Sequence, residues 1–255
     1  MTFESKIDAF LDVHNRQDQP GVVLAIIKNG GLIYQRGYGM ADLEHEILIT
    51  PSTVFDVASV AKQFTGFAIA KLAVEGIISL DDNVRMYLPE MPDFGDKITV
   101  QHLVHHISGL RDWVQSMVVA GVRMDDVISF QHILKMVNHQ QSLNFKPGYM
   151  YLYSNTGYNL LAEIIQRVTK QLFADWTESN IFHPLGMSNT YFCDNHEMIV
   201  KNRASSYYKH EGRFYNTLNS LTALGSSSLY STVEDLAKWI LNLDEKWVGG
   251  DQVIE

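Results

Sequence analysis

The sequence predicts an α+β fold, in which an antiparallel sheet is flanked by helices and lies beside a mostly helical lobe. Three features indicate it: a strand–turn–strand pattern over 22–40, a strongly apolar helix over 60–75, and four helical segments between 100 and 169. A hairpin and a buried helix followed by a block of helices are typical of a sheet with a helical lobe beside it. With 255 residues, 46% of them apolar, the chain can bury a sizeable core, as one large domain or two interleaved lobes.

The N-terminal region is expected to form a helix and then a β-hairpin. Apolar residues recur every three or four positions over 3–16, which predicts a helix. Residues 22–27 are apolar and mostly β-branched, and Asn29-Gly30 is a hairpin turn signal before a second strand over 32–40. Because two strands are not stable alone and little strand signal follows the last helix, we expect the sheet to be incomplete at the C-terminus.

The rest of the chain is expected to alternate between helices and short strands. Helical spacing covers 100–107, 111–120, 129–139 and 155–169, and short strands are expected at 189–193 and on both sides of Glu211-Gly212. The sequence Ser231-Thr232-Val233-Glu234 reads as a capping box that starts a last helix over about 232–243. We expect residues 1–58 and 188–255 to belong to the α/β lobe, and 59–187 to the helical lobe.

The apolar helix begins with the pattern Ser59-Val60-Ala61-Lys62. Residues three apart are neighbours on a helix, and Lys62 shares its face with apolar positions. A lysine amine is normally protonated at neutral pH, but burial and the positive end of a helix disfavour the charged form. The free amine can then take a serine proton, and backbone N–H groups at the helix start can stabilise negative charge.

The same pattern has less specific interpretations. Ser59 could serve only as the N-cap of the helix. A second copy, Ser206-Tyr207-Tyr208-Lys209, has no apolar helix behind it, and we interpret it as a coincidence. The spacing alone is therefore a hypothesis that needs support from the rest of the chain.

A second group of polar residues lies in Tyr153-Ser154-Asn155, just before the helix over 155–169. A phenol near an ammonium group can relay protons, and an asparagine can both donate to and accept from a substrate amide. Taken alone, the pattern is better explained by a packed loop tyrosine and an asparagine that caps the helix.

Together these stretches resemble the serine β-lactamase and penicillin-binding-protein superfamily, most closely its class C β-lactamase-like branch. S-x-x-K is one of that superfamily's signatures. The matching stretches occur in the family's order and span roughly residues 5 to 243; they are 55–64, 76–82, 106–110, 153–158 and 229–239.

The resemblance implies a β-lactamase/transpeptidase-like fold and specific roles for four residues. Ser59 would be the acylated nucleophile, Lys62 its proton partner and Tyr153 a second acid/base group, while Asn155 would contact the substrate amide. The backbone N–H of Ser59 would form half of the oxyanion hole. The family's third motif, Lys-Thr-Gly or His-x-Gly on a late strand, is not found. His210-Glu211-Gly212 precedes the last helix and reads as a hairpin turn.

Composition restricts the partners. A formal net charge of −9 argues against nucleic acid and anionic lipid. No window is apolar enough to span a membrane and no signal peptide is visible, so we expect a cytoplasmic protein unless a leader was removed. No glycine-rich phosphate loop is present. His102 and His106 have a spacing that can hold zinc, but no H-E-x-x-H accompanies them, so we expect no metal or other cofactor.

Two functional hypotheses follow. The first is a serine hydrolase that forms an acyl-enzyme on a β-lactam, a D-amino-acyl peptide or a small ester. The second is a β-lactamase-like scaffold that binds a ligand or partner without turnover. An inactive, truncated piece of a longer enzyme would reconcile both. The open edge of the sheet also invites self-association.

Overall fold

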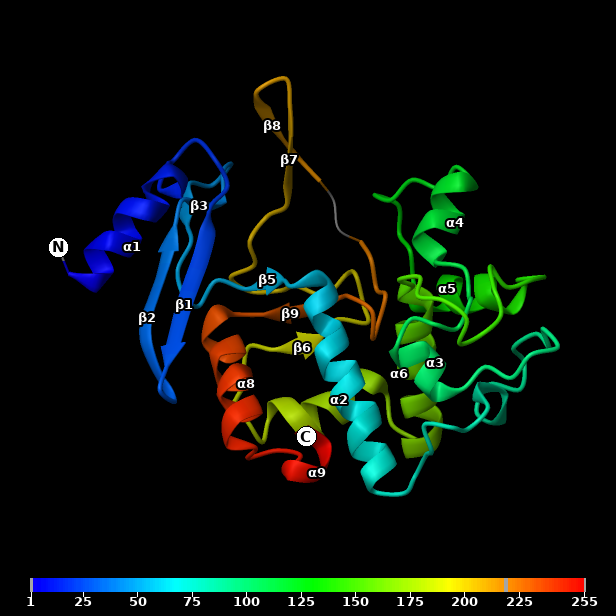
Figure 1. The fold of residues 1–255 in the computed structure, drawn as a ribbon. Coiled ribbons are helices and arrows are strands. Elements are labelled where there is room, and N and C mark those ends of the chain that lie inside the picture. The colour runs from blue at the N-terminus through cyan, green and yellow to red at the C-terminus, as the bar shows by residue number, and fades with distance from the viewer. Residues whose placement is uncertain (1, 218–219, 255) are drawn as a thin grey trace.

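The computed structural model describes residues 2–217 and 220–254, and it shows helices on both sides of short antiparallel strands (Figure 1). The strands are β1 (Val22–Lys28), β2 (Gly31–Tyr38), β3 (Met40–Asp42), β4 (Ile47–Leu48), β5 (Phe55–Asp56), β6 (Tyr191–Phe192), β7 (Tyr207–His210), β8 (Arg213–Asn216) and β9 (Leu229–Ser231). They pair as β1–β2, β3–β4, β5–β9–β6 and β7–β8, each pair antiparallel. This arrangement confirms the predicted α+β class.

The helices surround these strands and build the lobe at the right of Figure 1. They are α1 (Phe3–Leu11), α2 (Ala61–Val74), α3 (Val100–Val104), α4 (Trp113–Val119), α5 (Phe130–Asn138), α6 (Asn155–Thr169), α7 (Phe173–Thr177), α8 (Val233–Glu245) and α9 (Asp251–Ile254). Short 3₁₀ turns occur at Asp12–His14, Ala58–Val60 and Val84–Met86, and a π-helical turn at Glu178–Phe182. None of the described helices is long and apolar enough to cross a membrane.

Helix α2 runs through the centre of the molecule and is buried along most of its surface, as its sequence predicts. Phe64 is fully buried, with its ring 4.5 Å from Trp239 of α8 and 5.2 Å from Phe182 between ring centroids. A Phe→Ala change at such a position costs about 3–5 kcal/mol. The exposed face carries an ion pair, Lys71 to Glu75 at 2.6 Å. The packing of α2 therefore fixes the position of its N-terminal turn.

The N-terminal hairpin forms as predicted, and the helix before it is shorter than expected. Asn29 and Gly30 have positive φ angles of 52° and 72°, which the two-residue hairpin turn requires. Helix α1 ends at Leu11 and a 3₁₀ turn over Asp12–His14 follows, whereas the periodicity predicted a helix to residue 16. Helix α8 packs on β1 and β2. Within the described residues, β2 is the only strand that pairs with β1.

The last long helix starts one residue later than the predicted capping box implies. Thr232, not Ser231, is the N-cap, and its side chain accepts the N–H of Asp235 at 3.2 Å. Ser231 instead ends strand β9, where its hydroxyl lies 2.8 Å from that of Thr190. The prediction of Ser231 as the cap was wrong because both residues carry a hydroxyl, and the strand pairing decides between them.

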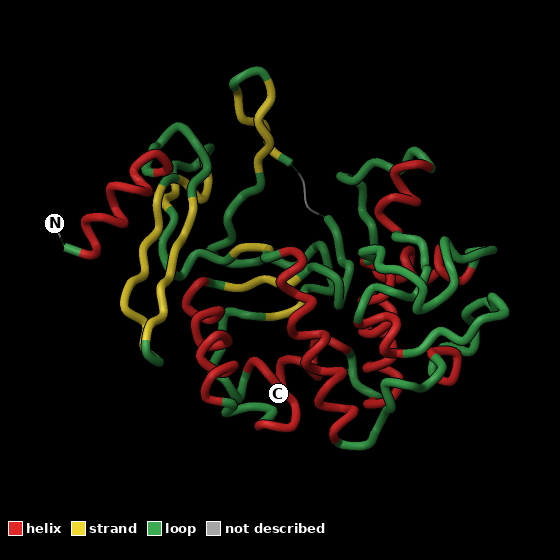
Figure 2. Tube along the Cα trace, in the orientation of Figure 1, coloured by secondary structure: helices red, strands yellow, loops and turns green. Residues whose placement is uncertain are grey.

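The short sheet β5–β9–β6 connects the start of α2 to the C-terminal part of the chain (Figure 2). Just before β9, the loop 223–228 packs against α6. Gly225 has a φ of 82°, and a Cβ there would lie 2.5 Å from the carbonyl oxygen of Tyr158. Only glycine allows this approach. The loop is thereby held against the helices that carry the candidate site.

Candidate active site

Ser59 lies in a strained turn between β5 and α2. Ala58, just before it, has a φ of 47°, a left-handed conformation that a residue with a Cβ rarely adopts. The side chain of Asp56 accepts the N–H of Ala58 at 2.9 Å, and Asp56 itself is paired with β9. The Ser59 side chain is exposed at the start of the helix. Such strain persists only where the surrounding structure enforces it, and it is common at functional sites.

Lys62 is buried, with 8% of its surface exposed, and its ammonium group faces three oxygen atoms. Its Nζ donates to Ser59 Oγ at 3.2 Å, to Asn155 Oδ1 at 2.9 Å and to the carbonyl oxygen of Ser226 at 2.7 Å. The amine is therefore held in one place, beside the hydroxyl of Ser59. None of these three acceptors is a carboxylate.

The surroundings of Lys62 favour its neutral form. Burial lowers the pKa of Lys62 to about 8, and the negative charge of Asp112 opposes this shift in part. At pH 7 about a tenth of the molecules would then carry a free amine there, whereas an ordinary lysine is almost wholly protonated. A free amine next to a serine hydroxyl can act as its base.

Tyr153 and Asn155 reach the same place from the start of α6. Tyr153 Oη lies 2.9 Å from Ser59 Oγ, and the centroid of its ring lies 5.0 Å from Lys62 Nζ. Asn155 is the first residue of α6, and its backbone N–H donates to Asp112 Oδ1 at 2.7 Å. A carboxylate is favoured at a helix N-terminus, so Asp112 anchors the end of α6 that carries Asn155.

All four residues singled out from the sequence thus lie together, although 94 positions separate Ser59 from Tyr153. The cluster combines a hydroxyl, a buried amine, a phenol and an amide. This combination can transfer an acyl group: the hydroxyl attacks, the amine and phenol move protons, and the amide positions a carbonyl compound.

Three groups that hold this cluster were not among the site residues predicted from the sequence. They are the Ser226 carbonyl oxygen, the Asp112 carboxylate and the His106 ring. Sequence patterns report side chains, so they carry no signal for a backbone acceptor such as Ser226. Asp112 could have been found as an acidic residue before a helix, but its partner Asn155 lies 43 positions away.

His106 supports Tyr153 by stacking. The ring centroids of His106 and Tyr153 lie 4.6 Å apart, and the ring centroids of His106 and Tyr158 lie 5.1 Å apart. His106 Nδ1 accepts the backbone N–H of Ser154 at 3.1 Å, and burial lowers the pKa of the imidazole. His102 Nδ1 caps α3 by accepting the N–H of Thr99. Each of the two histidines considered as zinc ligands therefore accepts a backbone N–H at its Nδ1.

The remaining motif candidates lie outside the cluster. In the second Ser-x-x-Lys copy, Ser206 lies just before β7 and Lys209 lies within it, in the exposed hairpin β7–β8. Glu211 and Gly212 form the turn of that hairpin, with φ angles of 47° and 81°, as predicted.

Comparison with known proteins identifies a family and relatives of this chain. The family model described as Beta-lactamase matches residues 3–254. A curated relative, the D-aminopeptidase of Gluconobacter oxydans (strain 621H), is 26% identical over 245 residues, which are 96% of this chain and 46% of that protein. The chain spans about half the length of the curated relatives it matches.

Solved structures show the same fold. The octameric penicillin-binding protein homologue from Pyrococcus abyssi superposes with a TM-score of 0.86 at 29% identity, covering 99% of this chain and 59% of that one. The D-amino acid amidase from Ochrobactrum anthropi SV3, in complex with L-phenylalanine amide, gives a TM-score of 0.83 at 26% identity, covering 98% and 73%.

Proposed function

Because this chain belongs to the Beta-lactamase family, we propose that it is a serine hydrolase that works through an acyl-enzyme on Ser59. The observation that carries the proposal is the contact of three groups: Ser59 Oγ lies 3.2 Å from the buried Lys62 Nζ and 2.9 Å from Tyr153 Oη. A hydroxyl between an amine of lowered pKa and a phenol is an activated nucleophile.

The proposed reaction has two stages. The neutral Lys62 amine takes the Ser59 proton while Oγ attacks the substrate carbonyl carbon, and the backbone N–H of Ser59 stabilises the resulting oxyanion. The tetrahedral intermediate breaks its bond to the leaving group, which takes a proton relayed through Tyr153. Water then attacks the acyl-Ser59 ester, which releases a carboxylic acid and restores the serine. Asn155, held by Lys62 at its Oδ1, would contact the substrate amide.

For the substrate we propose an amide of a D-amino acid, from among the three classes that the sequence left open. The support is that two proteins similar to this chain are a D-aminopeptidase and a D-amino acid amidase. A β-lactam and a small ester present the same reacting carbonyl, and they are the comparison substrates in the test.

The nucleophile is tested by covalent labelling of the whole chain. A fluorophosphonate probe should form one adduct on the peptide that carries Ser59, detected by mass spectrometry. Ser59→Ala should abolish the adduct, whereas Ser206→Ala, in the second copy of the pattern, should leave it unchanged. Labelling that persists in Ser59→Ala would refute the role of Ser59, and absence of any adduct would favour a scaffold that binds without turnover.

The substrate class is tested separately, with release of ammonia from D-phenylalanine amide and from its L-enantiomer. The D-enantiomer should react faster in the unaltered chain, and neither should react in Ser59→Ala. Faster hydrolysis of a β-lactam or a phenyl ester than of the D-amide would retain the hydrolase and overturn the proposed substrate.

A further inference from the structure

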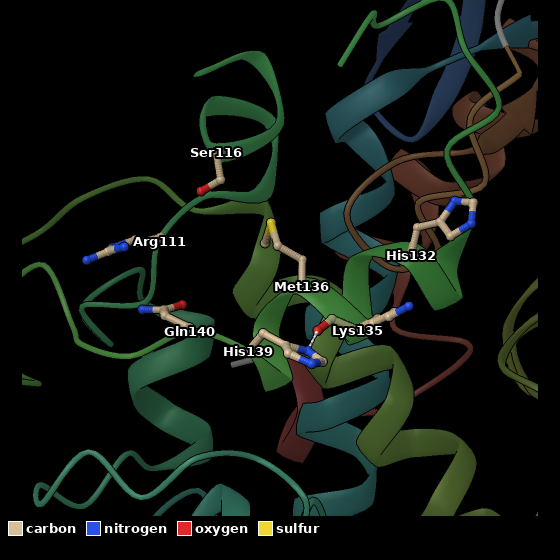
Figure 3. Close-up of a pocket in the computed structure, with 7 residues that line it drawn as sticks. All are labelled: Arg111, Ser116, His132, Lys135, Met136, His139 and Gln140. Atoms are coloured by element: carbon tan, nitrogen blue, oxygen red, sulfur yellow. Dashed lines mark hydrogen bonds between the residues drawn. The ribbon is translucent and has the colours of Figure 1, made fainter. Parts of the chain in front are cut away.

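A cavity on the helical lobe is lined by none of the four residues of the candidate active site. It has a volume of about 480 Å³ and lies against α4, α5 and the residues just before and after them (Figure 3). Pockets of roughly 300–1,000 Å³ are the usual size for small-molecule sites. Its lining residues are Arg111, Ser116, His132, Lys135, Met136, His139 and Gln140.

The rim of this cavity is cationic in a chain whose overall charge is negative. Arg111 and Lys135 carry positive charges, His132 and His139 add two imidazoles, and none of the seven lining residues has a carboxylate. Neither Arg111 nor Lys135 forms a salt bridge within residues 2–217 and 220–254. The formal charge of the chain is −9. A cationic site of this kind favours an anion.

Gln140 provides an independent sign of a missing partner. It is 8% exposed, and its Nε2 donates to the carbonyl oxygen of Ser142 at 2.7 Å. Its Oε1 is buried, and no hydrogen-bond donor for it is found in the described part of the chain. Figure 3 shows this oxygen on the side of the amide nearer the middle of the cavity. A buried oxygen without a donor is costly, and a ligand N–H would relieve that cost.

The centre of the cavity is apolar. Met136 of α5 lies in the middle of the ring of lining residues in Figure 3, with the polar and charged side chains around it. A methionine thioether adapts to different apolar groups and is common at binding surfaces. The cavity therefore offers three features: cations at the rim, one acceptor for an N–H, and an apolar surface.

We propose that this cavity binds a small organic carboxylate that carries an amide N–H and a short apolar group, as an N-acyl amino acid does. Arg111, which lies on the same side of Met136 as Gln140 in Figure 3, attracts the carboxylate, Gln140 Oε1 accepts the N–H, and Met136 contacts the apolar group. The proposal does not depend on the hydrolase function, because it concerns binding by residues outside the Ser59 cluster.

The test measures binding by NMR in the full chain with Ser59→Ala, so that no ligand is turned over. The methyl group of Met136 is labelled with ¹³C and assigned by its loss in Met136→Leu. N-acetyl-L-leucine should shift this methyl signal in a saturable way. N-acetyl-L-leucinamide, which lacks the charge, and 2-acetoxy-4-methylpentanoate, in which an oxygen replaces the N–H, should each bind about tenfold more weakly or not at all, since each loses one hydrogen-bonded or charged contact.

Two variants separate the rim charge from general electrostatics. Arg111→Gln should raise the dissociation constant for N-acetyl-L-leucine about fivefold, the size expected for an exposed charge pair. Lys146→Gln, which removes a positive charge from an exposed side chain outside the cavity, should leave it unchanged. Equal binding of the three ligands, no shift of the Met136 methyl signal, or equal effects of the two variants would each overturn the proposal.

Discussion

The pattern Ser-x-x-Lys occurs twice in this chain, and the two copies lie in opposite environments. Ser59 lies in the 3₁₀ turn that leads into the buried helix α2, and Lys62 lies in the first turn of that helix, so the two residues are neighbours. Ser206 lies just before strand β7 of an exposed hairpin and Lys209 lies within that strand, and residues three apart along an extended chain point to opposite faces. The Lys209 ammonium lies 5.2 Å from the centroid of the Phe214 ring.

The difference shows that the Ser-x-x-Lys pattern does not by itself place a serine hydroxyl next to a free amine. In the first copy the helix supplies the proximity, and the buried position supplies an amine whose pKa is lowered to about 8. The strand of the second copy separates hydroxyl and amine, and leaves the amine at the surface. The following predictions test whether this contrast, rather than sequence spacing, controls reactivity.

The largest expected effect comes from removing each lysine in turn. Lys62→Gln should lower kcat/KM for D-phenylalanine amide by about 10³-fold, because it removes the proposed general base. Lys209→Gln should leave kcat/KM unchanged. Steady-state kinetics measures both, and circular dichroism checks that both variants fold. Similar losses in the two variants would mean that the helix environment of Lys62 has no special role.

A smaller loss is expected from the phenol next to Ser59. Tyr153→Phe should lower kcat/KM by about 10²-fold, because one proton-transfer group is lost while the ring can still stack on His106. Tyr208→Phe is the matched control, since Tyr208 is an exposed tyrosine inside the second copy. An unchanged rate in Tyr153→Phe would show that Lys62 acts without the phenol.

The pH dependence tests the state of the amine directly. If neutral Lys62 is the base, kcat/KM should rise about tenfold per pH unit below pH 8 and level off above it, because the lowered pKa of about 8 marks where the amine loses its proton. If Lys62 were exposed to bulk water, its pKa would be about 10.4, and kcat/KM would level off only near that pH. A profile that is flat from pH 6 to 8 would contradict the assignment of the base to Lys62.

Much of this arrangement could be predicted from the sequence, because local patterns determine it. Helix α6 begins and ends at the predicted residues 155 and 169, and the apolar periodicity of α2 placed Lys62 on a buried face. The resemblance to a known family then assigned Ser59 and Tyr153 to one site, although 94 positions separate them. No local pattern could predict this.

Other parts of the site could not be predicted, because they depend on how distant loops pack. The Ser226 carbonyl oxygen reaches Lys62 only because Gly225 fits against Tyr158. The cavity near Gln140 likewise depends on the packing of α4 and α5, and no motif marks it.

The smallest effect concerns the turn before Ser59, which distinguishes the first copy at the backbone level. Ala58 has a φ of 47°, so Ala58→Gly should raise the free energy of unfolding by about 0.5–1 kcal/mol, because glycine adopts this conformation without a Cβ clash. Ala70→Gly, the same change inside α2, should instead lower it by about 1 kcal/mol. Urea unfolding measures both. Opposite signs would show that the strain belongs to the turn that presents Ser59, whereas destabilisation by both variants would show that the turn is not strained.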